Sequence, residues 1–110
     1  MDRAKVRRDF DRAVNMTAGE LDKWLKTDES RSVGFHREGA TESVGHASGR
    51  HIVRILKKRN ADLSDDDYAH MRKVVGYVHR HTAQRPENIY TSRWRYSLMN
   101  WGHDPTGGTG

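Results

Sequence analysis

The chain has 110 residues, 34% of them hydrophobic, with no cysteine and a formal charge of +5. This length and hydrophobic content allow one modest core, so we expect a single domain, and the lack of cysteine excludes disulfides, thiolate metal sites and cysteine nucleophiles. No apolar run approaches a membrane span and residues 1–14 lack the apolar region of a secretion signal, so we expect a cytoplasmic protein.

The first segment, residues 2–14, has the pattern of a short amphipathic helix whose apolar side carries Val6, Phe10, Ala13 and Val14. Its other side mixes basic residues with aspartates. Because chain termini are poorly ordered unless they are packed, we expect residues 1–15 to be an extension with a loosely attached helix. The helical domain would then span residues 16–105, and residues 106–110 have the composition of a flexible tail.

Residues 16–27 carry the clearest helix signal. Thr17 with Glu20 three residues later has the pattern of a capping box, which predicts a helix over residues 18–26. Trp24 shares an apolar face with two leucines, and this spacing is more typical of a core than of a ring that stacks on a base.

Residues 28–46 contain several glycines and no sustained period, so we expect a long loop that is either functional or disordered. Near its end, Gly45, Ser48 and Gly49 could leave backbone N–H groups free at a helix start, a place that attracts phosphate. A plain turn would need the glycines equally.

Residues 48–59 predict a helix that Ser48 would cap, with an apolar edge opposite a basic side. The basic side chains recur every three or four residues with no acidic residue among them, which destabilises an isolated helix unless that side faces an anion. The backbones of DNA and RNA are the commonest anions that repeat along a surface. This basic side consists of Arg50, Arg54, Lys57 and Lys58.

The longest periodic segment lies within residues 63–86, and we take it as the central helix. Ser64 is its expected N-cap, and Asp65–Asp67 favour the positive end of the helix dipole. Lys73 and Arg80 lie off its apolar stripe, on a side that could flank the preceding basic helix. The stripe consists of Tyr68, Met71, Val74, Val75, Val78 and Thr82.

These two helices, joined by a short connection, have the outline of a helix-turn-helix. In that motif the first turn of the second helix approaches the bases, but here that turn carries three aspartates, which phosphates would repel. We therefore expect the helix of residues 48–59 to lie nearer the nucleic acid. Over residues 47–85 basic residues outnumber acidic ones nine to four, a surplus that is typical of a protein with an acidic partner.

After Pro86 the pattern predicts a final helix that is capped by Thr91 or Ser92 and ended by Gly102 and Pro105. The whole chain is therefore predicted to be all-α, a compact single domain of four or five helices. Its expected core comprises Leu21, Trp24, Leu25, Ile52, Ile55, Leu56, Met71, Val75, Val78, Trp94, Leu98 and Trp101.

Several segments taken together carry a family resemblance: MTAGELDKWLKT, SVGH followed by SGR and IVRILKK, DDDYAHMRKVVGYVHRH, AQRP and SRWRYSLMNWGHDP. The chain resembles a small microbial domain family of unknown function, found especially in bacteria, over about Met16 to Pro105. WRYSLMNWGHDP is the most specific part. Members are often labelled DNA-binding proteins, so the resemblance implies DNA binding as a candidate activity. Thr82 stands where this pattern leads us to expect a larger apolar residue.

Seven histidines invite a metal hypothesis. His79 and His81, however, are two residues apart on a helix and point in different directions, while His70 and His81 share a face at a separation of ~16 Å. The three adjacent aspartates are more simply partners of the helix dipole. We therefore predict no metal site, no cofactor and no enzymatic activity.

The predicted function is non-enzymatic binding of nucleic acid, duplex DNA before RNA, mainly through phosphate contacts and with little sequence specificity. An alternative is a protein-interaction or regulatory module whose basic face binds an acidic partner protein. A third is a small hydrolase that uses a carboxylate and a histidine. The predicted phosphate contacts come from Arg50, Arg54, Lys57, Lys58, Lys73 and Arg80.

Overall fold

The computed structural model describes residues 2–107, and every regular element within them is helical. The all-α prediction is confirmed, with one short helix more than expected. In chain order the elements are α1 (Arg3–Ala13), α2 (Ala18–Leu25), α3 (Asp28–Ser32), α4 (Val44–Lys57), the 3-10 turn η1 (Asn60–Asp62), α5 (Asp65–Thr82) and α6 (Arg93–Asn100). None of these helices is long and apolar enough to cross a membrane.

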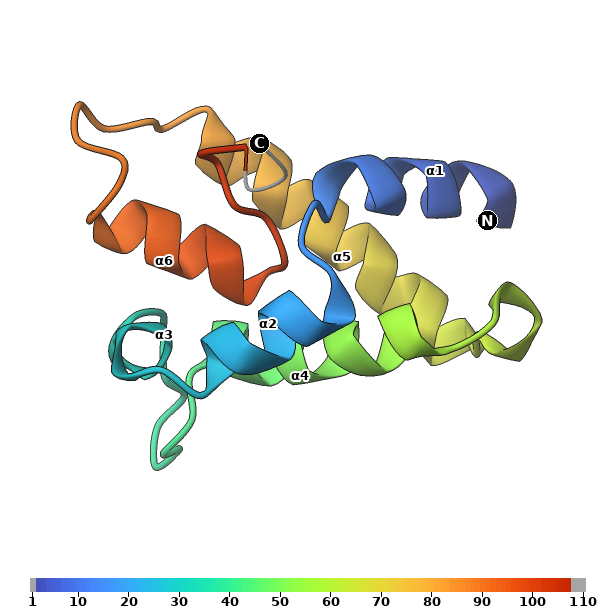
Figure 1. Cartoon of the computed structure of the whole chain (residues 1–110). Coiled ribbons are helices and arrows are strands. Elements are labelled where there is room, and N and C mark those ends of the chain that lie inside the picture. Colours follow the sequence, from blue (N-terminus) through green and yellow to red (C-terminus); the bar gives the residue numbers. More distant parts are fainter. Residues whose placement is uncertain (1, 108–110) are drawn as a thin grey trace.

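The helices pack as two pairs that the last helix joins. Figure 1 shows α1 lying against α5 and α2 lying against α4, while α6 contacts α2, α3, α4 and α5. The short helix α3 sits at the end of α6, beside the long loop that leads into α4. This arrangement leaves one side of α5 facing α1 and another side facing the amino-terminal half of α4 and the end of α6.

Helix starts follow the predicted capping chemistry. At α2, Thr17 Oγ1 accepts from the Glu20 N–H at 3.1 Å, and the Glu20 carboxylate accepts from the Thr17 N–H at 2.8 Å. At α5, Ser64 and Asp67 form the same reciprocal pair. Ser92 caps α6. These bonds satisfy backbone donors that a helix start otherwise leaves free.

The predicted start of α4 at Ser48 is wrong, because the helix begins one turn earlier. Ser43 is the N-cap, and its side chain accepts from the His46 N–H at 3.0 Å. Gly49 lies within the helix, where a Cβ atom would come 2.7 Å from the backbone oxygen of Asn100. Gly49 therefore allows α4 to pack closely against the end of α6, and it does not form a turn.

The helix α1 differs from the expected loosely attached extension. Phe10 is only 1% exposed, and Val6 and Ala13 are also buried in the common core. Arg7 donates to the Tyr68 hydroxyl at 2.8 Å, and Arg3 forms an ion pair with Asp65. The apolar side chains of α1 pack into the same core as Tyr68 of α5, so this helix completes the core. Burial of its apolar side stabilises it against the fraying typical of chain ends.

The segment with the most specific family resemblance, residues 94–105, forms hydrogen bonds to residues 13–16, where the helical domain begins. The Gly102 carbonyl, at a residue with φ of +81°, accepts from the N–H groups of Asn15 and Met16 at 3.1 and 3.2 Å. His103 Nδ1 lies 2.7 Å from the Ala13 carbonyl oxygen. The left-handed conformation at Gly102 favours glycine, so this position is fixed by backbone geometry.

The predicted core is largely observed. Eight of its members are buried, and Trp24, Leu56, Val75 and Trp94 are partly buried and packed against it. The buried residues outside the predicted core include Val6, Phe10, Ala13, Val14, Met16, Val53, Leu63, Tyr68 and Val74. Of the predicted flexible tail, residues 108–110 lie outside the described residues, whereas Thr106 donates both its N–H and its hydroxyl to Asp104.

Candidate functional site

Two adjoining pockets, each of about 420 Å³, lie where α4, α5 and the end of α6 meet the loop before α4. They share Val44, Lys73 and Trp101, and we refer to the two together as the groove. The His70 half is also lined by Arg37, Glu42, Ser48, Arg50, His51, Arg54 and His70. The Tyr77 half is also lined by Phe35, Gly45, Tyr77, Arg80, His81 and Ser97.

Four cationic side chains line the groove without a partner. Within residues 2–107, none of them forms an ion pair or a side-chain hydrogen bond, and all four are exposed. They come from the loop before α4, from α4 itself and from α5, so three separate segments direct positive charge into one place. These side chains are Arg37, Arg54, Lys73 and Arg80.

The one acidic residue among those that line the groove is Glu42, and it is already engaged. Arg50 donates to both of its carboxylate oxygens, at 2.8 and 2.6 Å, and His46 Nδ1 lies 2.5 Å from one of them. The hydrogen bond from Arg50, aided by His46 and opposed by burial, lowers the pKa of Glu42 to about 2. Arg50, predicted as a free phosphate contact, is therefore neutralised by a carboxylate.

Lys58 is neutralised in the same way. Its ammonium group lies 2.7 Å from the carboxylate of Asp67, which is only 3% exposed and also lies 2.8 Å from His51 Nε2. Burial raises the pKa of Asp67, but the bonds from Lys58, His51 and Ser64 outweigh it and hold the pKa below its usual range. Lys57 is exposed and without a partner in the described part of the chain, yet it lies outside the groove.

The predicted phosphate cradle of Gly45, Ser48 and Gly49 is wrong in its geometry. All three residues are buried within α4, so they do not form an open helix start. The Ser48 hydroxyl forms a hydrogen bond with His70 Nε2 at 2.8 Å and thereby joins α4 to α5. Gly45 nevertheless lines the groove, where its missing side chain leaves room beside Trp101.

A row of five aromatic rings runs along the floor of the groove. The ring centroids of His51 and His70 are 4.3 Å apart, those of His70 and Trp101 6.1 Å, those of Trp101 and Tyr77 4.3 Å, and those of Tyr77 and His81 4.2 Å. All four neighbouring pairs are stacked. Trp101, from the end of α6, lies between rings from α5 and so joins these two helices.

Two histidines of the floor, His70 and His81, are held in their neutral form, although the rim of the groove is cationic. Burial, together with nearby His51 and Lys73, lowers the pKa of His70 to about 4. Burial and Arg80 also lower the pKa of His81. The sequence pattern places His70, Tyr77 and His81 on one face of the central helix. It does not show that Trp101, from the end of α6, lies between His70 and Tyr77 and completes the row.

The geometry offers little for catalysis among the described residues. Ser48 and His70 are placed like a nucleophile and its base, yet the carboxylate nearby, Asp67, bonds to His51 instead of orienting His70. No group of three or more histidine, aspartate or glutamate side chains within residues 2–107 converges as metal ligands would.

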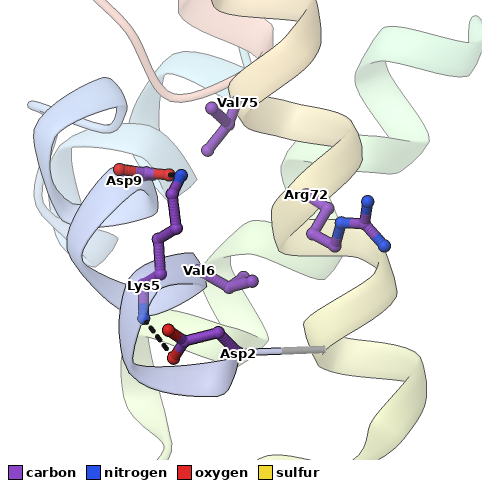
Figure 2. Close-up of a pocket in the computed structure, with 6 residues that line it drawn as sticks. All are labelled: Asp2, Lys5, Val6, Asp9, Arg72 and Val75. Carbon is purple, nitrogen blue, oxygen red and sulfur yellow. Dashed lines mark hydrogen bonds and ion pairs between the residues drawn. The ribbon is translucent and has the colours of Figure 1, made fainter.

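A second hollow, the cleft between α1 and α5, has a different character. It has a volume of about 300 Å³ and is lined by Asp2, Lys5, Val6, Asp9, Arg72 and Val75. Figure 2 shows Lys5 beside Asp9, and Arg72 across the cleft with its guanidinium directed away from these two residues. The Lys5 ammonium group lies 2.7 Å from the Asp9 carboxylate. The lining contains two aspartates, one lysine and one arginine, so neither positive nor negative charge predominates in the cleft.

Comparisons with known proteins give a family but no characterised relative. No curated protein and no solved structure matches the chain. One family model matches residues 9–99, from within α1 to within α6, and so begins earlier than the expected Met16. This match covers most of the chain, and the chain therefore belongs to the DUF3140 family, which is described as a protein of unknown function.

Proposed function

We propose that the protein binds nucleic acid, duplex DNA before RNA, as a binding protein without catalytic activity. The observation that supports this function is the groove with four unpartnered cations and a single, already neutralised carboxylate. Four like charges that face one groove repel one another, and an anionic ligand in the groove would relieve that repulsion. A phosphate backbone supplies such charges at regular intervals.

The binding surface differs from the one that the sequence pattern indicated. Arg54, Lys73 and Arg80 remain as contacts, Arg37 joins them, and Lys57 extends the surface along α4. Arg50 instead pairs with Glu42 in the lining of the groove, and Lys58 pairs with Asp67 outside that lining. Fewer direct phosphate contacts imply a weaker dependence of affinity on salt than six free cations would give.

The approach of the ligand follows from the position of acidic residues on α5. Its first turn carries Asp65, which pairs with Arg3, and the buried Asp67. Lys73 lies ~12 Å further along the helix. A strand of nucleic acid would therefore cross the middle of α5 instead of meeting its first turn, unlike the docking of an ordinary helix-turn-helix.

The test is a fluorescence-anisotropy titration of a short labelled duplex at several salt concentrations. With the four groove cations and Lys57 there are ~5 phosphate contacts, so the plot of log affinity against log salt should have a slope of about −4 to −5. Changing both Lys73 and Arg80 to alanine should weaken binding to all sequences alike and reduce the steepness of that slope by about 2.

The matched control is Arg72→Ala, which removes an unpartnered cation from the same helix on the side of the cleft. It should leave both affinity and slope close to those of the wild type. No binding at low salt would overturn the proposal. An acidic peptide that binds as tightly as the duplex, with the same salt dependence, would favour an acidic partner protein instead.

A further inference from the structure

The Tyr77 half of the groove has features that phosphate binding does not require. Phe35, on the loop before α4, is 72% exposed although it is a large apolar side chain. It lines the same pocket as Tyr77 and Trp101, with Lys73 and Arg80 also in the lining. The volume of about 420 Å³ lies within the range of small-molecule sites. An aromatic hollow with cations beside it suits a flat ring that carries a phosphate.

The indole N–H of Trp101 is the second feature. Buried tryptophans usually find an acceptor. Here Trp24 Nε1 donates to Asn100 at 2.8 Å and Trp94 Nε1 to the His81 carbonyl at 2.5 Å. Trp101 is only 5% exposed, yet its N–H has no acceptor among the described residues and is not sealed from solvent.

Gly45 explains how that N–H stays accessible. A Cβ atom at this position would lie 3.0 Å from Trp101 Nε1, and Gly45 lines the same half of the groove. The glycine thus lets α4 pass close to the indole without a side chain over the donor, and an alanine there would crowd the N–H. A ligand held in the pocket that Gly45 and Trp101 line, with an acceptor atom at its edge, could accept the hydrogen bond.

We infer that the Tyr77 half of the groove takes an unpaired nucleobase of a nucleic-acid strand. This inference rests on the proposed function. Phe35 offers its exposed ring for stacking on the base, the Trp101 N–H donates to an acceptor on the base edge, and Lys73 and Arg80 contact the adjoining phosphates. A base within an intact duplex is stacked on both faces and paired at its edge, so it cannot make these contacts.

The experiment compares an intact duplex with the same duplex containing one unpaired central nucleotide, and with a single strand, by anisotropy at one salt concentration. Stacking on an aromatic side chain should favour the probes with an unpaired base by about tenfold. Phe35→Ala should bring this preference to within about twofold. Gly45→Ala should act in the same direction by filling the space beside the indole.

The matched control is Tyr90→Ala, because Tyr90 is 65% exposed but lies outside the groove. It should keep the full preference. Equal binding of all three probes, or a preference that survives Phe35→Ala, would overturn the base pocket and leave the proposed function standing. No binding of any probe would overturn the proposed function itself. A free nucleoside monophosphate that binds as tightly as the strand would assign the pocket to a free nucleotide instead.

Discussion

The two sides of α5 carry similar residues in different surroundings. On one side Lys73 and Arg80 face the groove, where the single carboxylate is occupied by Arg50. On the other side Arg72 borders the cleft, where Lys5 and Asp9 are paired. The comparison teaches that a basic helix face becomes a candidate site only through what the neighbouring elements place beside it. We assign the cleft side to stability and the groove side to binding.

The largest expected effect concerns the stability side. Phe10→Ala should lower the free energy of unfolding by about 3–5 kcal/mol, because it removes a fully buried aromatic side chain between α1 and the rest of the core. Chemical denaturation measures this directly. Arg12→Ala, an exposed change on the same helix, should stay within about 0.5 kcal/mol. A loss below ~1 kcal/mol for Phe10→Ala would mean that α1 contributes little, and the contrast between the two sides would fail.

An intermediate effect is expected from the floor of the groove when pH changes. The folded pKa of His70 is about 4, below the ordinary histidine value of 6.5, because the ring is buried near His51 and Lys73, with Asp66 opposing. The unfolded chain therefore takes up a proton that the folded chain does not, and stability is full above pH 6.5 and declines as the pH falls towards 4. His81 shifts in the same direction.

Thermal melts between pH 7 and about pH 5.5 should show the first part of this decline, where the carboxylates are still largely ionised. His70→Gln should flatten the dependence without abolishing it, because His81 remains. Replacement of the exposed His36 by glutamine is the control and should leave the dependence as it is. An unchanged slope in His70→Gln would show that this ring is not held neutral by its surroundings.

The smallest effect has the opposite sign and concerns the charge of the groove. Glu42→Gln should release Arg50 and tighten DNA binding by about threefold, because it removes the one carboxylate from the lining. Asp62→Asn adds the same charge to the protein, but at an exposed ion pair with Arg59 that lies away from the groove. It should change affinity by less than about twofold. Equal effects of the two variants in the anisotropy titration would indicate attraction by net charge alone.

Much of the fold could be predicted because local chemistry determines it. Thr17 and Ser64 cap their helices through side-chain bonds that span three residues, and such bonds are visible as a sequence pattern. The start of α4 was harder to predict, because Gly45 and Gly49 look like turn residues. Their actual reason is close packing against the end of α6, more than fifty residues further along the chain.

The candidate site could be predicted only in part. Arg50 and Arg54 are one turn apart on the same side of one helix, and nothing in their local pattern distinguishes them. The difference lies in Glu42, which precedes the helix and pairs with Arg50 but not with Arg54. Lys58 likewise meets Asp67 only because α4 and α5 come together. Which cations remain free is therefore a property of tertiary packing.

The hydrogen bonds that Gly102 and His103 form with residues 13–16 determine when, during synthesis, the fold can be completed. The bond between His103 and Ala13 joins residues 90 positions apart. Contacts of such separation form late, because a long stretch of chain must be ordered first. A growing chain on the ribosome that has not yet reached Gly102 would leave its early residues without these partners. Synthesis interrupted at that stage would yield a helical but unclosed product, open to proteolysis.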